Sequence, residues 1–63
     1  MEKQDVILYG GRFDGKRMEV LPAESIVDLA YFEKDGTEVK NRYARDIARP
    51  GTFAFIGNIE VKS

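Results

Sequence analysis

The sequence contains neither cysteine nor histidine. Without cysteine there can be no disulfide and no thiolate metal site, and without histidine the commonest metal ligand and general base is missing. We therefore expect neither a metal nor a bound cofactor. A domain of 63 residues buries only about 60% of the surface that its unfolded chain exposes. Self-association is one expected route to stability, and a bare but well-packed core is the other.

Strong charge imbalance and long apolar runs are also missing. Ten basic and eleven acidic residues give a formal net charge of −1, which argues against both a DNA mimic and a strongly basic domain that coats nucleic acid. No apolar run approaches the roughly 20 residues that cross a bilayer. Residues 1–5 have neither the basic nor the apolar region of a signal peptide. We expect one domain over residues 1–63, located in the cytoplasm.

Three turn signals are present: Asp14-Gly15, Asp35-Gly36 and Gly57-Asn58 each lie between short apolar-rich runs. Such pairs supply the positive φ angles of tight hairpin turns. The runs between them predict strands at residues 6–9, 16–21, 38–45 and 52–56, with a short sixth strand at 59–61. The expected fold class is all-β, either a small antiparallel meander or an SH3-like or OB-like barrel of five to six short strands.

The first hairpin is expected to close through a three-residue bulged loop at Asp14-Gly15. This loop places Leu8 opposite Val20 and Gly10 opposite Met18. Gly10 and Gly11 then indicate a bulge or the close approach of another backbone.

Residues 25–33 admit two interpretations. A helix is possible because Ile26, Leu29, Ala30 and Glu33 have helical spacing after Pro22. A strand is favoured because a type I turn with a bulge at residues 34–36 produces matched cross-strand pairs. The expected pairs are Tyr31 with Val39, Val27 with Tyr43, Asp28 with Arg42 and Ala30 with Lys40. We predict a strand.

Two stretches carry short motifs. The first is a Gly-Gly-x-x-Asp-Gly opening at residues 10–15, followed by residues 16–22, and the second combines Tyr43-Ala44-Arg45 with Phe53-Ala54-Phe55-Ile56-Gly57. Together they resemble a family of small proteins of unknown function encoded by phages and actinobacterial genomes. Arg12 departs from that family, which usually carries proline there. The resemblance implies a small β domain found on mobile elements, located in the host cytoplasm if phage-encoded, and it assigns no functional residue.

Basic residues gather in two parts of the sequence, and aromatic residues lie among them. In small β-barrels, aromatic side chains flanked by cations can stack bases and neutralise phosphates, but a short chain also needs its aromatics in the core. Phe13 is the leading single candidate for an interaction residue, because an aromatic at a hairpin tip has little core to reach. The candidate interaction surface consists of Arg12, Phe13, Lys16, Arg17, Arg42, Tyr43 and Arg45.

Catalysis is not expected. The serines are Ser25 and Ser63, and no nucleophile, base and orienting group can be drawn from this sequence. Two functions remain. The first is an interaction module, encoded by a phage or mobile element, that binds a host or virion protein. The second is a nucleic-acid or nucleotide binder, which requires Arg12, Arg17, Arg42 and Arg45 to converge on one face beside an exposed aromatic.

Overall fold

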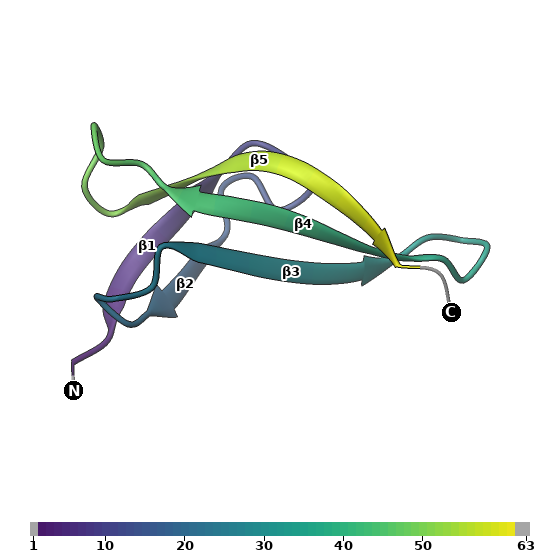
Figure 1. Ribbon diagram of the computed structural model, residues 1–63, viewed down its shortest axis with the longest axis horizontal. Coiled ribbons are helices and arrows are strands. Elements are labelled where there is room, and N and C mark those ends of the chain that lie inside the picture. The colour runs from purple at the N-terminus through teal and green to yellow at the C-terminus, as the bar shows by residue number, and fades with distance from the viewer. Residues whose placement is uncertain (1, 62–63) are drawn as a thin grey trace.

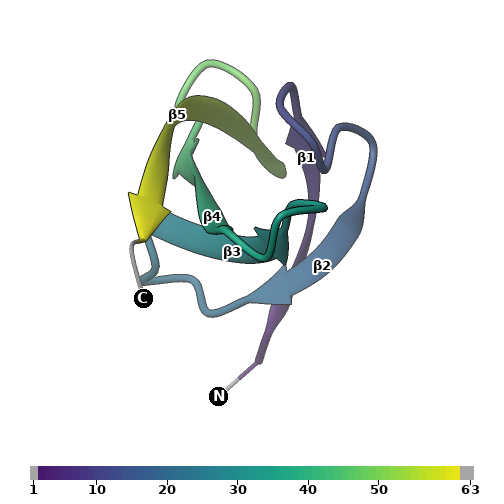
Figure 2. The same cartoon turned by 90° about the vertical axis from the view of Figure 1, so that its right-hand side faces the viewer.

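The computed structural model describes residues 2–61. Within this range the chain is all-β, as predicted, and forms one strongly curled sheet that resembles half of a barrel (Figures 1 and 2). The five strands are β1 (Gln4–Tyr9), β2 (Arg17–Val20), β3 (Ile26–Phe32), β4 (Glu38–Arg45) and β5 (Thr52–Val61).

The strands are arranged in the order β2-β1-β5-β4-β3. β1–β2 and β3–β4 are antiparallel hairpins, and β5 lies between them, antiparallel to β4 but parallel to β1. The parallel pair departs from a simple antiparallel meander, one of the two architectures expected. Parallel neighbours need a long crossover connection, and here residues 10–51, which include three strands, provide it.

The β3–β4 hairpin has the register predicted from its side chains. Tyr31 is opposite Val39 and Asp28 is opposite Arg42, so residues 26–32 form a strand and not a helix. The turn is closed by two backbone bonds of 2.9 Å, from the Glu33 N–H to the Thr37 carbonyl and from the Gly36 N–H to the Glu33 carbonyl. The rule that favourable side-chain pairs lie opposite each other across a hairpin therefore predicted β3 correctly.

The predicted register of the first hairpin is wrong. Gln4, not Leu8, is opposite Val20, and Val6, not Gly10, is opposite Met18. The Leu8 N–H donates to the Lys16 carbonyl over 2.8 Å, so the connection is a longer loop than the three-residue bulge expected. The physical reason lies outside the hairpin, because side chains of β4 hold this loop, as described below.

The predicted turn at Gly57-Asn58 is also wrong. Both residues lie within β5, where Gly57 is opposite Arg42 and Asn58 is opposite Asn41. The register shifts between Tyr43–Phe55 and Arg42–Gly57, so Ile56 is the extra residue of a β-bulge. β4 is eight residues long and offers backbone partners along its whole length, which favours a continued strand over a turn. The predicted fifth and sixth strands are therefore one.

The core occupies the inner face of the curled sheet. Its buried apolar side chains come from every strand and are Val6, Leu8, Val20, Val27, Val39, Tyr43 and Phe53. Neighbouring strands supply paired core residues. Leu8 lies beside Phe53 in the β1–β5 pair, and Val27 is opposite Tyr43 in the β3–β4 pair. One polar side chain, Asn41, is buried among the described residues.

Candidate functional site

The cationic residues of the predicted interaction surface are spread over different parts of the molecule. Lys16 and Arg17 are exposed on the β1–β2 hairpin, where Arg17 lies opposite Ile7. Arg42 pairs with Asp28 on the outer face. Arg12 lies in the loop between β1 and β2, with its guanidinium 4.3 Å from the centre of the Tyr31 ring. Arg17 and Arg42 both lie on the outer face, but β1 and β5 separate their strands, and Arg12 lies elsewhere, in the loop.

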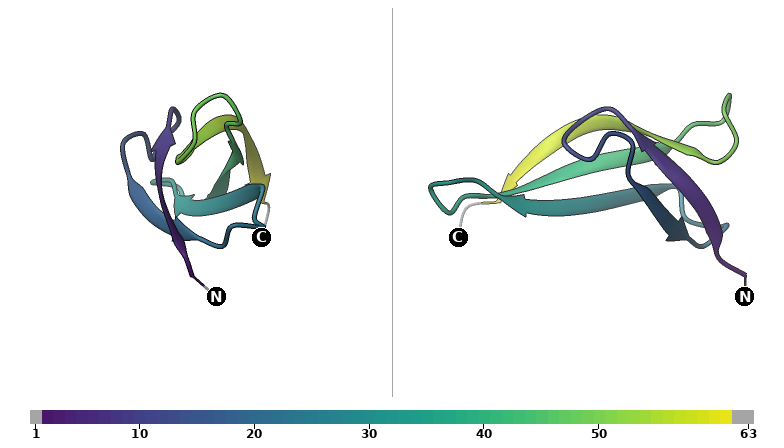
Figure 3. Two further views of the ribbon diagram at one scale, coloured as in Figure 1. Left: turned by 90° about the vertical axis from the view of Figure 1, so that its left-hand side faces the viewer. Right: turned by 180° about the vertical axis from the view of Figure 1, so that it is seen from behind.

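Tyr43 is a core residue, so its assignment to a surface is wrong. Its side chain is fully buried and packs edge-to-face on Phe55 with ring centres 5.7 Å apart. The hydroxyl donates to the Gly10 carbonyl over 2.7 Å and accepts the Phe13 N–H over 3.1 Å. Tyr43 therefore anchors the β1–β2 loop from the opposite hairpin, and Figure 3 shows this loop lying against the middle of the sheet.

Arg45 has a structural role on the inner face. Its guanidinium donates to the backbone carbonyls of Glu24, Leu21 and Pro22 over 2.8–3.3 Å, and it also donates to the Gln4 side chain. The cation lies 4.9 Å from the centre of the Phe53 ring. Its donors thus hold the connection between β2 and β3 in place, and they are not directed at an external anion.

Phe13 does not protrude from a hairpin tip, contrary to the prediction. It is half-buried, packs against the core and makes an edge-on contact with Tyr31 at 6.0 Å between ring centres. The loop folds inward because its backbone is bonded at two neighbouring residues. The Phe13 N–H is bound by Tyr43, and the Arg12 N–H donates to Asn41 Oδ1 over 2.9 Å.

The Asp28–Arg42 pair is a bidentate contact, with Nε–Oδ1 and NH2–Oδ2 distances of 2.9 and 3.2 Å. Hydrogen bonding to Arg42 holds the pKa of Asp28 below its usual value of 3.8, and Asp28 raises the pKa of Arg42. Each side chain is about a third exposed or more. The pair neutralises much of the charge that Arg42 would otherwise offer to a phosphate.

The outer face of the sheet carries a row of apolar residues across four strands. Ile26 is opposite Ala44, Ala44 is opposite Ala54, and Ala54 is beside Tyr9. Ile7 lies two residues before Tyr9 on the same face of β1, and Ile56 follows Ala54 in β5. We call these six residues the outer apolar surface: Ile7, Tyr9, Ile26, Ala44, Ala54 and Ile56. Its four large side chains are between 40% and 59% exposed.

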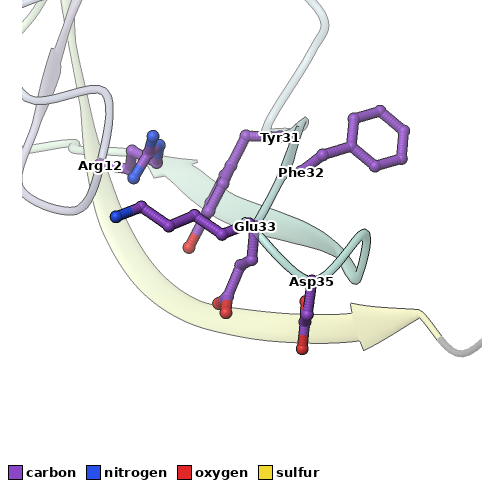
Figure 4. Close-up of a pocket in the computed structure, with 6 residues that line it drawn as sticks. Arg12, Tyr31, Phe32, Glu33 and Asp35 are labelled. Carbon is purple, nitrogen blue, oxygen red and sulfur yellow. The ribbon is translucent and has the colours of Figure 1, made fainter.

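A hollow of about 510 Å³ lies near the far end of β3, between the β1–β2 loop and the β3–β4 turn. Its lining combines cations from Arg12 and Lys34 with carboxylates from Glu33 and Asp35. Figure 4 shows Tyr31 and Arg12 on one side, while Phe32 projects in another direction. The mixed charges do not converge on one ligand chemistry.

Neither the outer apolar surface nor the buried amide of Asn41 was predicted from the sequence. Asn41 Nδ2 donates to Asn58 Oδ1 over 2.7 Å, while its carbonyl oxygen binds the loop. A signal existed for each feature. Asn41 falls between Val39 and Tyr43 on the inward face of the predicted strand, and residues 6–9 are apolar on both faces of theirs.

Within residues 2–61 there is no helix that is long and apolar enough to span a membrane. The same residues hold no group of three acidic, histidine or cysteine side chains placed to bind a metal ion.

Comparison with protein-family models, curated proteins and solved structures finds no significant match to this chain. The resemblance to small phage and actinobacterial proteins therefore stays a prediction based on its short motifs.

Proposed function

We propose that this protein is a small, non-enzymatic interaction module that binds another protein through the outer apolar surface. The observation that carries the proposal is the apolar row from Ile26 to Tyr9. The solvated face of a sheet of this kind ordinarily alternates to polar residues. A contiguous exposed apolar patch on a small domain instead marks a contact surface.

The surroundings of this surface match the anatomy of a protein interface. Such interfaces have an apolar centre, often with tyrosine as an anchor, and a polar rim. Tyr9 is 59% exposed, and the Arg49 guanidinium lies 5.6 Å from its ring centre. Arg17 and the Asp28–Arg42 pair border the apolar row. The expected partner is therefore a protein with an apolar contact patch, and the motif resemblance suggests a host or virion protein.

The alternative, a nucleic-acid or nucleotide binder, has less support. It requires several arginines on one face beside an exposed aromatic. Arg45 is bonded to backbone carbonyls and Arg42 is paired with Asp28. A nucleic-acid site would have to rely on the cations of the candidate surface that remain exposed, which are Arg12, Lys16 and Arg17.

The test is affinity capture from host lysate, with and without nuclease, comparing three immobilised proteins. These are the wild type, the outer-face variant Tyr9→Glu with Ile56→Glu, and the matched control Ile47→Glu. Ile47 is 92% exposed in the β4–β5 connection and is not one of the six residues of the outer apolar surface, so its change adds charge without altering any of them. We expect a stoichiometric, nuclease-resistant protein on the wild type and control, reduced at least about tenfold on the outer-face variant.

Two outcomes contradict the proposal. Equal retention of the captured protein by all three immobilised proteins would show that the outer apolar surface does not take part in binding. Retention that disappears with nuclease, and that weakens when Lys16 and Arg17 are replaced by glutamate, would establish the nucleic-acid alternative instead.

A further inference from the structure

β3 is a border strand of the sheet. It is hydrogen-bonded to β4 on one side, and no described strand is hydrogen-bonded to its other side (Figure 1). An edge strand presents unpaired N–H and C=O groups to any chain that approaches, so proteins usually shorten, charge or kink their edges. The opposite border strand, β2, follows this rule with four residues, Arg-Met-Glu-Val. β3 has seven residues, Ile-Val-Asp-Leu-Ala-Tyr-Phe, with no lysine or proline.

The hydrogen bonds at both ends of β3 show which backbone groups face the free edge. The Ser25 carbonyl accepts the Arg45 N–H and the Glu33 N–H donates to Thr37, both toward β4. Because bonding alternates along an antiparallel pair, the odd-numbered residues between them also face β4. The N–H and C=O groups of Ile26, Asp28, Ala30 and Phe32 then face outward. All four residues are exposed, and the Phe32 side chain is 68% exposed.

We propose that β3 pairs with β3 of a second copy of this chain, antiparallel, about a two-fold axis at Leu29. The sequence of the strand is self-complementary in this register. On the outer face Ile26 meets Phe32 of the second copy, and on the inner face Val27 meets Tyr31. Asp28 meets Ala30, and Leu29 meets its own copy. A β-branched residue thus opposes an aromatic twice over, which is a favourable cross-strand pairing.

Neighbouring registers lack this complementarity. Moving the axis to Asp28 places two aspartates directly opposite each other, which is destabilising. Moving the axis to Ala30 places Phe32 opposite Asp28 and Ile26 opposite Lys34. A slip of one residue would set inward-facing positions of one copy opposite outward-facing positions of the other. The Leu29 register also matches edge-facing residues with one another, which allows about eight backbone hydrogen bonds.

The expected dimer is weak and reversible. Pairing a single short strand buries less than the roughly 1,200 Å² typical of stable interfaces, so we expect a dissociation constant in the micromolar range. The dimer contact and the outer apolar surface share Ile26. They can still be tested separately, because pairing uses the backbone edge of β3 and the partner-binding test alters Tyr9 and Ile56, which lie on β1 and β5.

Sedimentation equilibrium from about 1 to 500 µM, chosen to bracket a micromolar constant, tests the proposal with three variants. Ala30→Pro removes an outward N–H, which a border strand tolerates without losing a ladder bond. Phe32→Lys charges the edge, and Ile47→Lys is its matched control. We expect wild type and Ile47→Lys to dimerise alike, and Ala30→Pro and Phe32→Lys to weaken dimerisation at least tenfold. Circular dichroism verifies folding, and Phe32→Lys carries the test if Ala30→Pro fails to fold.

Single cysteines test the register, because the chain has none of its own. Leu29→Cys places two thiols opposite each other at the axis, whereas Phe32→Cys places them many residues apart. Under mild oxidation, Leu29→Cys should form a disulfide dimer at least tenfold faster than Phe32→Cys. The proposal is overturned if the wild type stays monomeric throughout, if the edge variants dimerise normally, or if both cysteines react at one rate. The Tyr9→Glu, Ile56→Glu variant should dimerise like the wild type, which separates this result from partner binding.

Discussion

The β1–β2 loop and the β3–β4 turn carry the same Asp-Gly signal but have different structures. In the turn at residues 33–37, the bonds are local, including one from the Thr37 N–H to Asp35 Oδ1. In the loop at residues 10–16, the backbone is also bonded by Tyr43 and Asn41 from β4. The bonds of the β3–β4 turn are local, whereas the β1–β2 loop is tied to the core through Tyr43, Asn41 and the packing of Phe13. A short turn motif fixes geometry only where no distant side chain competes for its backbone.

The largest effect on stability should come from Gly11→Ala, which introduces a side chain into the β1–β2 loop. Gly11 has a φ of 67°, and an added Cβ would lie 2.7 Å from both Tyr43 Oη and Phe55 Cδ1. Left-handed backbone strain of about 1–2 kcal/mol combines with overpacking of about 1–3 kcal/mol. Urea unfolding should therefore show a loss of about 2–5 kcal/mol. A loss below 1 kcal/mol would mean that the loop does not pack on Phe55 as described.

Tyr43→Phe should have the next largest effect. The change removes a hydroxyl that satisfies the Gly10 carbonyl and the Phe13 N–H, and it leaves both groups in a partly buried site. We expect a loss of about 1–3 kcal/mol in the free energy of unfolding. Tyr31→Phe is the matched control and should change stability by less than about 0.5 kcal/mol. Equal effects of the two changes would remove the special role assigned to the Tyr43 hydroxyl.

Gly36→Ala makes the corresponding change in the local turn. Gly36 has a φ of 89°, but nothing lies within 4 Å of an added Cβ. Strain without a clash should destabilise the fold by about 1–2 kcal/mol, less than Gly11→Ala. Chemical denaturation of both variants side by side gives the comparison. If Gly36→Ala were the more harmful, the contrast between the local turn and the core-bound loop would be lost.

The smallest effect concerns the pH dependence of the β3–β4 turn. The hydrogen bond from the Thr37 N–H holds the pKa of Asp35 below its usual value of 3.8. A lowered pKa in the folded state contributes stability that is present above the unfolded value and lost as pH falls through the folded one. The protection of the Thr37 amide against exchange, measured relative to its intrinsic rate at each pH, should therefore decrease below about pH 4. Asp35→Asn keeps an acceptor that does not titrate, so it should abolish this acid-dependent change.

The sequence predicted the β3–β4 hairpin correctly because its register depends on pairs only a few residues from the turn. Val27, Asp28 and Tyr31 find their partners across a short connection, so local pattern and final structure agree. The β1–β2 loop could not be predicted in this way. Its path depends on Asn41 and Tyr43, which are remote in sequence and whose position relative to Gly10 is set by the whole sheet.

The candidate surface was predicted least well. Charge and aromaticity were visible in the sequence, but the contacts that occupy Tyr43, Arg45 and Phe13 come from segments remote in sequence and could not be predicted from it. The bulge at Ile56 shows the same limitation, because Gly57-Asn58 has the composition of a turn while β4 supplies a partner strand. Alternation along a strand predicts its two faces, and the packed sheet decides which face is solvated.

The central position of β5 has a consequence for how this protein folds during its synthesis on the ribosome. Both hairpins emerge before residues 52–61, yet in the sheet order they are joined only through that strand. Leu8 cannot meet Phe53 until β5 has left the exit tunnel. Contacts so distant in sequence are formed slowly. The continuous sheet can therefore form only after β5 has been synthesised, and until then the backbone edges of β1 and β4 that pair with β5 stay open.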